Sequence, residues 1–349
     1  MEQRIFGHLA DGRPVHLFTL TNARGVQAQL TNWGGTLVSL RVPDKQGQMG
    51  DVVLGFDELA PYLGDHPKFG TLIGRFGNRI AHGRFTLDGH RYQLACTDGP
   101  HHLHGGVEGF DRKLWQAEPV AAPEGEALRF SYISPNGEEG YPGTLEVGVT
   151  VHLTDQSSLL IAYEATTDQP TVVNLTHHSY FNLSGRGDVR DHQVQVLASH
   201  YHPVDATGLP TGEQAPVQGT AFDLRELTPL RAGLDGDDPQ VKLRQGYDHN
   251  FVLDHRGDQL LQQCVALVRD PQSGRQLQVF TTQPGMQLYT ANFLSDTPGK
   301  GGQVYQPHSA LCLETQHFPD APNQPDAPST VLRPGERYQH AVVYRFGTM

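Results

Sequence analysis

The sequence predicts an all-β protein, a large antiparallel β-sandwich that spans residues 1–349 as a single domain. The 349 residues include 39 glycines and 24 prolines, which implies many turns and therefore many short strands. Several segments alternate apolar and polar residues with the period of two that is typical of strands. Helical patterns are scarce and form no repeating βαβ unit. A large all-β unit can reach this length as one domain.

The predicted strands follow one another with turn residues between them. Asp88-Gly89 is the strongest short hairpin signal in the chain, because both residues tolerate the backbone of a tight turn. We expect a short helical turn at residues 225–230 and an ordered loop at residues 319–328. Strands are expected at residues 15–20, 26–30, 36–42, 84–87, 91–94, 145–151, 159–165, 193–196, 276–280 and 338–346.

Charge and composition exclude several classes of partner. The formal net charge is -12, which argues against nucleic acid, because nucleic-acid binding depends on Lys and Arg contacts to phosphate. It also disfavours anionic membrane surfaces and highly phosphorylated substrates. No window approaches the 18 consecutive apolar residues of a membrane span. We expect a small-molecule ligand, no nucleic acid, no membrane, and a monomer or homodimer.

Cysteine usage indicates a reducing compartment. Cys96, Cys264 and Cys312 are sparse, odd in number and show no CxxC spacing, so we expect no disulfide framework. Cys312 lies in an apolar run and is interpreted as a small core residue. The first residues show no apolar stretch of signal-peptide length, and cytoplasm is the expected location.

The first of three chemically suggestive segments is His101-His102-Leu103-His104-Gly105-Gly106. His102 and His104 with Glu108 resemble the start of a cupin metal site, although a matching second half is not found. Alternatively, these histidines satisfy hydrogen bonds in a turn, which is the favoured interpretation of His101. A third interpretation makes His104 a ligand-contacting group on a loop whose glycines let a ligand approach closely.

The second segment, residues 174–182, holds the adjacent pair His177-His178. Neighbours on a strand face opposite ways, so at most one of the two is expected in a given cleft.

The third segment, residues 313–319, holds Glu314. If Leu311 and Leu313 face the core, alternation sends Glu314 and Cys312 to the opposite face. A glutamate in such an apolar segment is expected to have either a polar partner or a function. A histidine and a glutamate in one cleft form an acid–base pair that works near neutral pH.

Two further segments offer hydrogen-bonding groups for a polyhydroxy ligand. Residues 74–80 place arginines beside Asn78, and residues 246–251 place Asp248 beside an amide.

Together, the motifs resemble the aldose 1-epimerase (galactose mutarotase) family, in family order across nearly the whole chain. They are Gly-Arg-Phe-Gly-Asn-Arg-Ile at 74–80, Leu-His-Gly-Gly at 103–106, Asn-Leu-Thr-His-His-Ser-Tyr-Phe-Asn-Leu at 174–183, Tyr-Asp-His-Asn-Phe at 247–251, Gly-Met-Gln-Leu-Tyr-Thr-Ala-Asn-Phe at 285–293 and Leu-Glu-Thr-Gln-His-Phe-Pro-Asp-Ala at 313–321. Departures are small: Gly77 replaces the usual Ala, asparagines are missing from residues 97–102, and Tyr247 replaces Phe, which adds a hydroxyl near the cleft.

The resemblance implies a supersandwich enzyme that interconverts the α and β anomers of free hexoses such as galactose and glucose, without metal or other cofactor. By matched position, Glu314 resembles the general base, His178 the general acid and His104 a second imidazole near the ring oxygen. The residues that resemble sugar-hydroxyl binders are Arg79, Asn78, Asp248 and Gln287.

Two alternatives stay open at this point. A hexose 6-phosphate epimerase would need a basic cluster for the phosphate dianion, to which Arg75 and Arg79 are candidates. A non-catalytic sugar-binding module would keep the binding residues but would not need Glu314 and His178 together.

Overall fold

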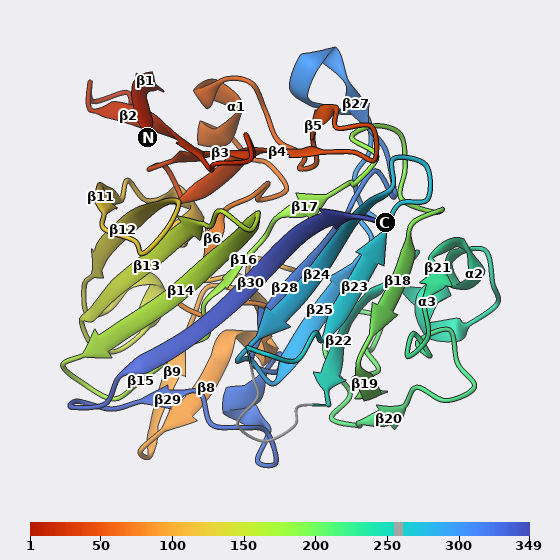
Figure 1. The fold of residues 1–349 in the computed structure, drawn as a ribbon. Helices are drawn as coiled ribbons and strands as arrows, with labels where there is room; N and C mark the ends of the chain where they lie inside the picture. Colours follow the sequence, from red (N-terminus) through yellow and green to blue (C-terminus); the bar gives the residue numbers. More distant parts are fainter. Residues whose placement is uncertain (255–260) are drawn as a thin grey trace.

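A computed structural model describes residues 1–254 and 261–349 of the protein. Strands dominate it and form three main antiparallel sheets (Figure 1). The first has five strands in sequential order, at the top of Figure 1. Its members are β1 (Glu2–His8), β2 (Pro14–Thr21), β3 (Gln27–Thr31), β4 (Thr36–Pro43) and β5 (Met49–Asp51).

The largest sheet has nine strands, and its long strands cross the front of Figure 1. The C-terminal strand β30 lies near its centre, between β14 and β24, which joins the middle of the chain to its end. In sheet order the strands are β11 (Gln116–Val120), β12 (Glu126–Ser134), β13 (Leu145–Leu153), β14 (Ser158–Thr167), β30 (Tyr338–Thr348), β24 (Arg275–Thr281), β23 (Ala266–Arg269), β18 (Gln193–Val196) and β21 (Thr228–Pro229).

A six-stranded sheet lies behind the second half of the nine-stranded sheet (Figure 1). In order it contains β17 (Tyr180–Phe181), β28 (Leu311–Gln316), β25 (Gly285–Tyr289), β22 (Asp248–Leu253), β19 (Ala198–Tyr201) and β20 (Ala215–Pro216).

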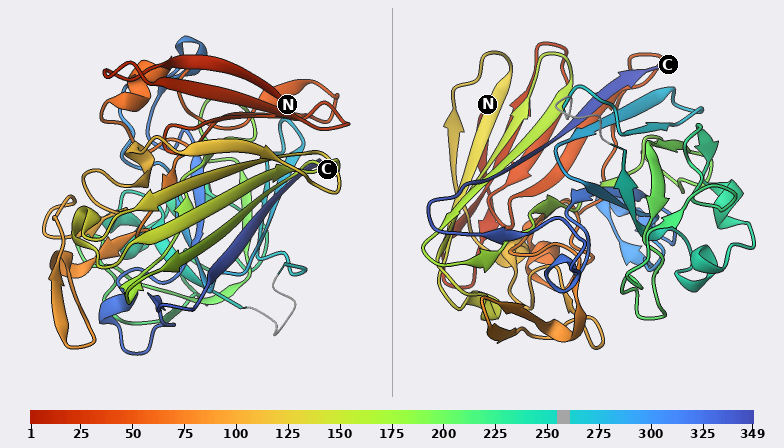
Figure 2. Two further views of the ribbon diagram at one scale, coloured as in Figure 1. Left: turned by 90° about the vertical axis from the view of Figure 1, so that its left-hand side faces the viewer. Right: turned by 90° about the horizontal axis from the view of Figure 1, so that it is seen from below.

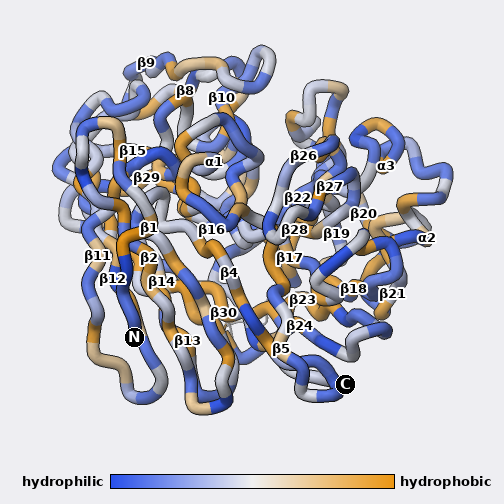
Figure 3. The backbone as a smooth tube through the Cα atoms, turned by 90° about the horizontal axis from the view of Figure 1, so that it is seen from above, coloured by the Kyte–Doolittle hydropathy of each residue, from blue (hydrophilic) through white to orange (hydrophobic). Residues whose placement is uncertain are grey.

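The principal core lies between these sheets. Phe18 and Leu30 of the first sheet pack with Leu128 and Phe130 of β12, and Figure 2 shows these two layers beside each other. At the other end, residues of β17, β22, β25 and β28 belong to the same buried cluster, among them Leu313. In Figure 3 the tube is hydrophobic along β17 and β30 and mostly hydrophilic at peripheral turns. The predicted β-sandwich is confirmed.

Five pairs of short strands lie outside the three main sheets of the described residues. They are β6 (Leu72–Ile73) with β16 (Thr176–His177), β7 (Arg79–Ile80) with β10 (His102–Leu103), β8 (Arg84–Leu87) with β9 (His90–Gln93), β15 (Thr171–Val172) with β29 (Val331–Leu332), and β26 (Thr297–Pro298) with β27 (Val304–Tyr305). The helices are short: α1 (Leu59–Leu63), α2 (Arg231–Leu234) and α3 (Pro239–Leu243), with 3₁₀ turns at Ala81–Gly83, Phe110–Arg112, Glu138–Gly140, Lys300–Gly302 and Ala321–Asn323. None of the described helices is long and apolar enough to cross a membrane.

Local predictions have mixed outcomes. The hairpin at Asp88-Gly89 is confirmed, with φ of 50° and 80° at the two turn residues, as a type I′ turn requires. The helical turn at residues 225–230 is wrong. Residues 228–229 pair with β18 instead, and the helix begins at Arg231. A partner strand more than thirty residues away along the chain overrides the local preference here.

Candidate active site

A cavity of about 460 Å³ lies on the face of the six-stranded sheet that points away from the principal core. Six of the seven predicted site residues line it: Glu314, His178, His104, Arg79, Asn78 and Asp248. All six are buried, with at most 9% of each residue exposed. Gln287 lies behind this lining, where its side-chain amide donates to Asp248 Oδ1 at 2.9 Å.

Sheet register sets the floor of the cavity. Gln287 of β25 lies opposite Glu314 of β28, while Tyr289 lies opposite Cys312 and Asp248. Because residues two apart on a strand share a face, these side chains form two adjacent rows on one side of the sheet. The intervening residues of β28 point into the principal core, as alternation predicts.

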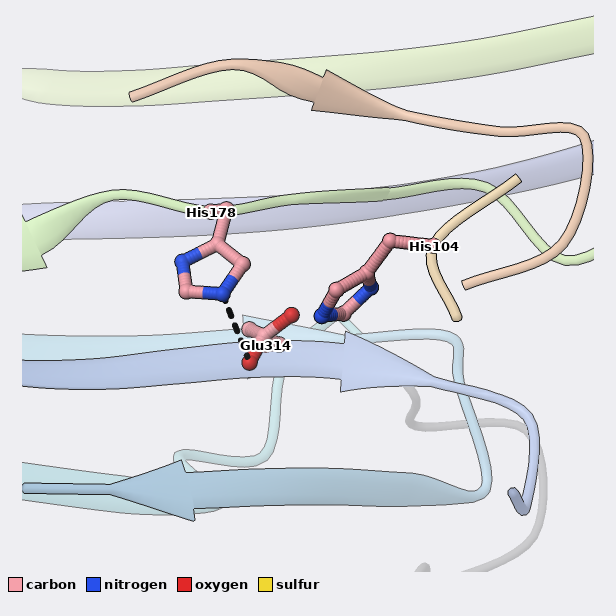
Figure 4. A group of neighbouring side chains, drawn as sticks. All are labelled: His104, His178 and Glu314. Carbon is pink, nitrogen blue, oxygen red and sulfur yellow. Dashed lines mark ion pairs between the residues drawn. The ribbon is translucent and has the colours of Figure 1, made fainter. Parts of the chain in front are cut away.

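Glu314 and His178 face each other across the cavity floor. Glu314 Oε1 lies 3.7 Å from His178 Nε2, and Glu314 Oε2 is buried without a hydrogen-bond partner (Figure 4). The His178 ring stacks on Tyr180, with centroids 5.0 Å apart and planes inclined by 18°. The expectation that only one of the two adjacent histidines enters the cleft is confirmed, because His177 turns away and bonds Ser179.

Burial shifts the protonation of this pair. It raises the pKa of Glu314 to about 8, and the nearby negative charge of Asp248 adds to the rise. Burial lowers the pKa of His178 to about 3, and the positive charge of Lys68 acts in the same direction. At neutral pH the free site therefore favours a protonated carboxyl beside a neutral imidazole. The pair carries one proton that both groups can hold.

His104 has a fixed tautomer. The backbone N–H of Asn78 donates to His104 Nδ1 at 3.1 Å, and a backbone N–H can only donate. Burial lowers the pKa of His104 well below its ordinary value, so the ring is neutral and its proton is on Nε2. The His104 ring lies 5.2 Å from that of His178 (Figure 4). His104 thus offers an N–H donor at the acid–base pair.

Ion pairs hold the hydrogen-bonding groups of the cavity wall. The guanidinium of Arg244 donates to Asp248 Oδ2 at 2.8 Å, and Arg79 Nε donates to Asp98 at 2.8 Å. Burial alone would raise the pKa of Asp248, but Arg79 and Arg244 lower it below its usual value. Asp248 is therefore an ionised acceptor at the cavity.

The glycines after His104 have a different role from the one predicted. A Cβ on Gly105 would lie 1.8 Å from the carbonyl oxygen of Gly74, and one on Gly106 would lie 2.1 Å from the carboxylate of Glu139. These glycines allow close packing of the loop on the protein itself, so the interpretation that they admit a ligand is wrong.

Three other sequence interpretations change. The Tyr247 hydroxyl donates to the carbonyl of Ala221 and lies outside the cavity lining, so it does not enter the cleft. Arg75 is buried, and its guanidinium donates to three backbone carbonyls, which removes it as a phosphate ligand. Both ring nitrogens of His102 are hydrogen-bonded within the fold, which rules out the cupin-like set. His101 bonds the backbone of His82, as the structural interpretation expected.

The cavity-lining residues that sequence reasoning missed include His66, Lys68, Arg244, Tyr289 and Phe293. Tyr289 and Phe293 lie within the Gly-Met-Gln motif, and alternation from Gln287 could have indicated Tyr289. Lys68 and Arg244 carry no local signal, because each gains its place from an ion pair with Asp111 or Asp248 in the folded chain.

In the part of the chain that the structure describes, His104, His178 and Glu314 also form a group whose possible ligand atoms for a cation lie within 4.8 Å of one another. The His104 nitrogen that is not bonded by the fold, Nε2, carries the proton of the neutral ring, so it offers no lone pair to a cation. The arrangement suits proton transfer better than metal binding.

The fold and the cavity thus define an all-β protein with an acid–base pair set among ion-paired hydrogen-bonding groups. Comparison with known proteins is specific. The family model described as aldose 1-epimerase matches residues 16–345. The galactose mutarotase of Homo sapiens is 49% identical over 98% of this chain and 97% of its own length, and the aldose 1-epimerase of Escherichia coli (strain K12) is 40% identical over 96% of each.

Solved structures agree with this result. A GalM/aldose epimerase homologue from C. elegans superposes with a TM-score of 0.88 at 32% identity, covering 95% of this chain and 99% of that one. Galactose 1-epimerase from Lactobacillus acidophilus gives a TM-score of 0.88 at 28% identity, covering 99% and 98%. The chain belongs to the aldose 1-epimerase family, which confirms the resemblance found in the sequence.

Proposed function

We propose that this protein is a mutarotase that interconverts the α and β anomers of free aldoses such as galactose and glucose. The observation that carries the proposal is the 3.7 Å approach of Glu314 to His178 on the floor of a polar cavity large enough for a monosaccharide. Relatives named galactose mutarotase and aldose 1-epimerase support the same reaction.

Ring opening requires one proton to leave the sugar and one to enter it. Glu314 takes the proton of the C1 hydroxyl while the bond between C1 and the ring oxygen breaks, and His178 Nε2 gives a proton to that oxygen. Rotation about C1–C2 presents the other face of the aldehyde, and ring closure reverses both transfers. One positioned acid and one positioned base contribute roughly 10²–10⁴-fold each.

The proton of the pair starts in either position. With Glu314 protonated and His178 neutral, the site is ready to close the open-chain aldehyde. A cyclic sugar favours the opposite arrangement, because its C1 hydroxyl can donate to the unpaired Glu314 Oε2 and so stabilise the carboxylate. His104 contributes a neutral N–H donor to the ring oxygen as negative charge develops there.

Sugar hydroxyl groups are bound by the cavity wall. We assign this role to Arg79, Asn78 and Asp248, which line the cavity. Gln287 has the indirect role of holding the carboxylate of Asp248.

A neutral sugar fits the cavity better than a hexose 6-phosphate. The cavity-lining cations Lys68, Arg79 and Arg244 are each paired with an aspartate. None of these three cations is left without a carboxylate partner to form the basic cluster that a phosphate dianion needs. The cysteine pattern further leads us to propose a cytoplasmic protein. The oligomeric state that we propose is a monomer or homodimer.

Polarimetry tests the proposal. Fresh α-galactose and α-glucose should reach their final rotation faster with the EDTA-treated protein than without it. Acceleration with glucose 6-phosphate alone would replace the proposal by phosphosugar epimerisation, and no acceleration with any of the three sugars would favour a binding module.

A further inference from the structure

Cys312 is buried at the back of the acid–base pair. Cys312 is 0% exposed to solvent. Its Sγ lies 3.6 Å from His178 Nδ1, within the range of a hydrogen bond to sulfur. Strand register fixes this position, since Cys312 lies opposite Tyr180 on one side and Tyr289 on the other. The rings of both tyrosines pack on His178. The imidazole therefore has defined neighbours on its faces and at Nδ1.

We propose that Cys312 is a positioning residue that keeps the proton of neutral His178 on Nδ1 and so leaves Nε2 as the nitrogen that exchanges a proton with the substrate. The inference rests on the proposed mutarotase function, because it identifies which nitrogen of the acid must be free. The thiol itself does not line the sugar cavity.

Two contacts favour the proton on Nδ1. His178 Nε2 faces Glu314, so Nδ1 is the nitrogen on the side of the protein backbone. The carboxyl of Glu314 is protonated at neutral pH and faces Nε2, so it favours a lone pair on that nitrogen and leaves the imidazole proton on Nδ1. There the sulfur of Cys312, 3.6 Å away, is a weak acceptor for the N–H.

The chemistry needs this tautomer. If Nε2 gives its proton to the ring oxygen, the neutral ring that remains carries its proton on Nδ1, and Nε2 is free to take a proton back. A ring held as the Nε2–H tautomer has no lone pair there and cannot act as the base during ring closure. His104 has that second arrangement, imposed by the N–H of Asn78.

A neutral sulfur orients the ring without fixing its charge. Burial raises the pKa of the Cys312 thiol well above its ordinary value, so it stays protonated. A carboxylate at this position would stabilise the imidazolium and make the proton harder to give away. The thiol thus holds the ring while the charge state of His178 stays responsive to Glu314.

The test combines kinetics with nitrogen NMR of the imidazole. Cys312→Ala should lower kcat on the order of tenfold with little change in KM, as expected when an orienting partner of an imidazole is lost. Cys312→Ser, which keeps a small acceptor in place, should restore most of kcat. Cys264→Ala is the control, because it removes a half-buried thiol outside the cavity lining.

Long-range ¹H–¹⁵N spectra of the sugar-free protein should show a protonated Nδ1 and an unprotonated Nε2 in His178. The signals are assigned as those that disappear in His178→Asn. Cys312→Ala should mix the two tautomers, whereas Cys312→Ser should not. Unchanged tautomer and kcat in the alanine variant would overturn the proposal, as would equal losses in both variants with the tautomer unchanged.

These readouts separate the two proposals. If the wild-type protein fails to accelerate mutarotation, the proposed function is wrong, yet the His178 tautomer in the resting protein still shows whether Cys312 controls it. Circular dichroism of each variant establishes that it is folded before its spectra are compared.

Discussion

Two groups of histidines that lie close to one another in the fold differ in how many of their ring nitrogens the protein binds. Both nitrogens of His102 are engaged by the protein, through the carbonyl of Ala95 and the hydroxyl of Tyr141. In His104 and His178 the fold holds Nδ1, while the ring reaches the cavity. The difference shows that a histidine is available for chemistry here when the fold leaves one ring nitrogen uncommitted and the ring also reaches the cavity, which adjacent positions in a sequence do not reveal.

The strongest test of the cavity group is Glu314→Gln. We expect turnover to fall by roughly 10²–10⁴-fold, because glutamine has the same shape but cannot accept the C1 proton. Sugar binding, measured by calorimetry, should be largely retained, since the groups assigned to hydroxyl binding are unchanged. Near-normal turnover by polarimetry would remove Glu314 as the base.

His178→Asn tests the second member of the pair. Turnover should fall within the same range of roughly 10²–10⁴-fold, because asparagine cannot deliver a proton to the ring oxygen. The rate should be measured from pH 5 to 8 in both proteins. If the variant keeps the wild-type rates across this range, the acid is His104 instead, and the assignment of the two tautomers must be exchanged.

Arg244→Met tests a cavity residue that no local sequence pattern indicates. The variant leaves the buried carboxylate of Asp248 without its 2.8 Å ion pair. Since that carboxylate is assigned to sugar hydroxyl binding, KM should rise about tenfold, the equivalent of losing roughly one hydrogen bond to a charged group, while kcat changes less. Initial-rate kinetics on galactose separate the two parameters. A tenfold loss confined to kcat would instead connect Arg244 to the chemistry.

His102→Phe is the matched test of the structural group. It leaves the hydroxyl of Tyr141 and the carbonyl of Ala95 without their partner. Unsatisfied buried groups cost about 1–3 kcal/mol each, so the free energy of unfolding should fall by this order. Turnover per folded molecule should stay within about twofold. A large loss of kcat in a fully folded variant would contradict the division between the two groups.

Sequence alone predicted what depends on local alternation. Leu311 and Leu313 face the core and Glu314 faces the cavity because a strand has a period of two. The features that the sequence could not predict depend on partners far away along the chain. The packing of Gly105 is set by the carbonyl of Gly74, and the pairing of residues 228–229 with β18 is set by the sheet.

The same dependence on distant partners explains which residues of the site were predicted and which were not. The motif match predicted that the acid–base residues share one site, because the order of the motifs along the chain is distinctive. The ion pairs that place Lys68 and Arg244 join residues on different loops and strands, so no spacing rule indicates them. Gln287 lies in a matched motif, yet its amide is directed to Asp248 rather than to the cavity lining.

The smallest expected effect is a pH-dependent change in stability that also distinguishes the two groups. Folding raises the pKa of Glu314 from its ordinary value near 4.3 to about 8. A carboxyl whose pKa is raised on folding contributes stability that is fully present below about pH 4.3 and is lost as the pH rises through about 8. Glutamine cannot ionise, so Glu314→Gln should gain stability relative to the wild type as the pH increases from 5 to 9.

Thermal unfolding of both proteins at intervals across this range measures the effect. The difference in Tm should move by roughly a few °C in favour of the variant towards pH 9. The stability contribution of His102 depends on pH in the opposite direction. Burial lowers the pKa of His102, so its neutral form stabilises the fold above about pH 6.5. That contribution is lost as the pH falls. His102→Phe should therefore narrow its Tm deficit at acid pH. A pH-independent difference for Glu314→Gln would mean that folding leaves the pKa of the Glu314 carboxyl near its ordinary value, and the carboxyl would then be ionised at neutral pH.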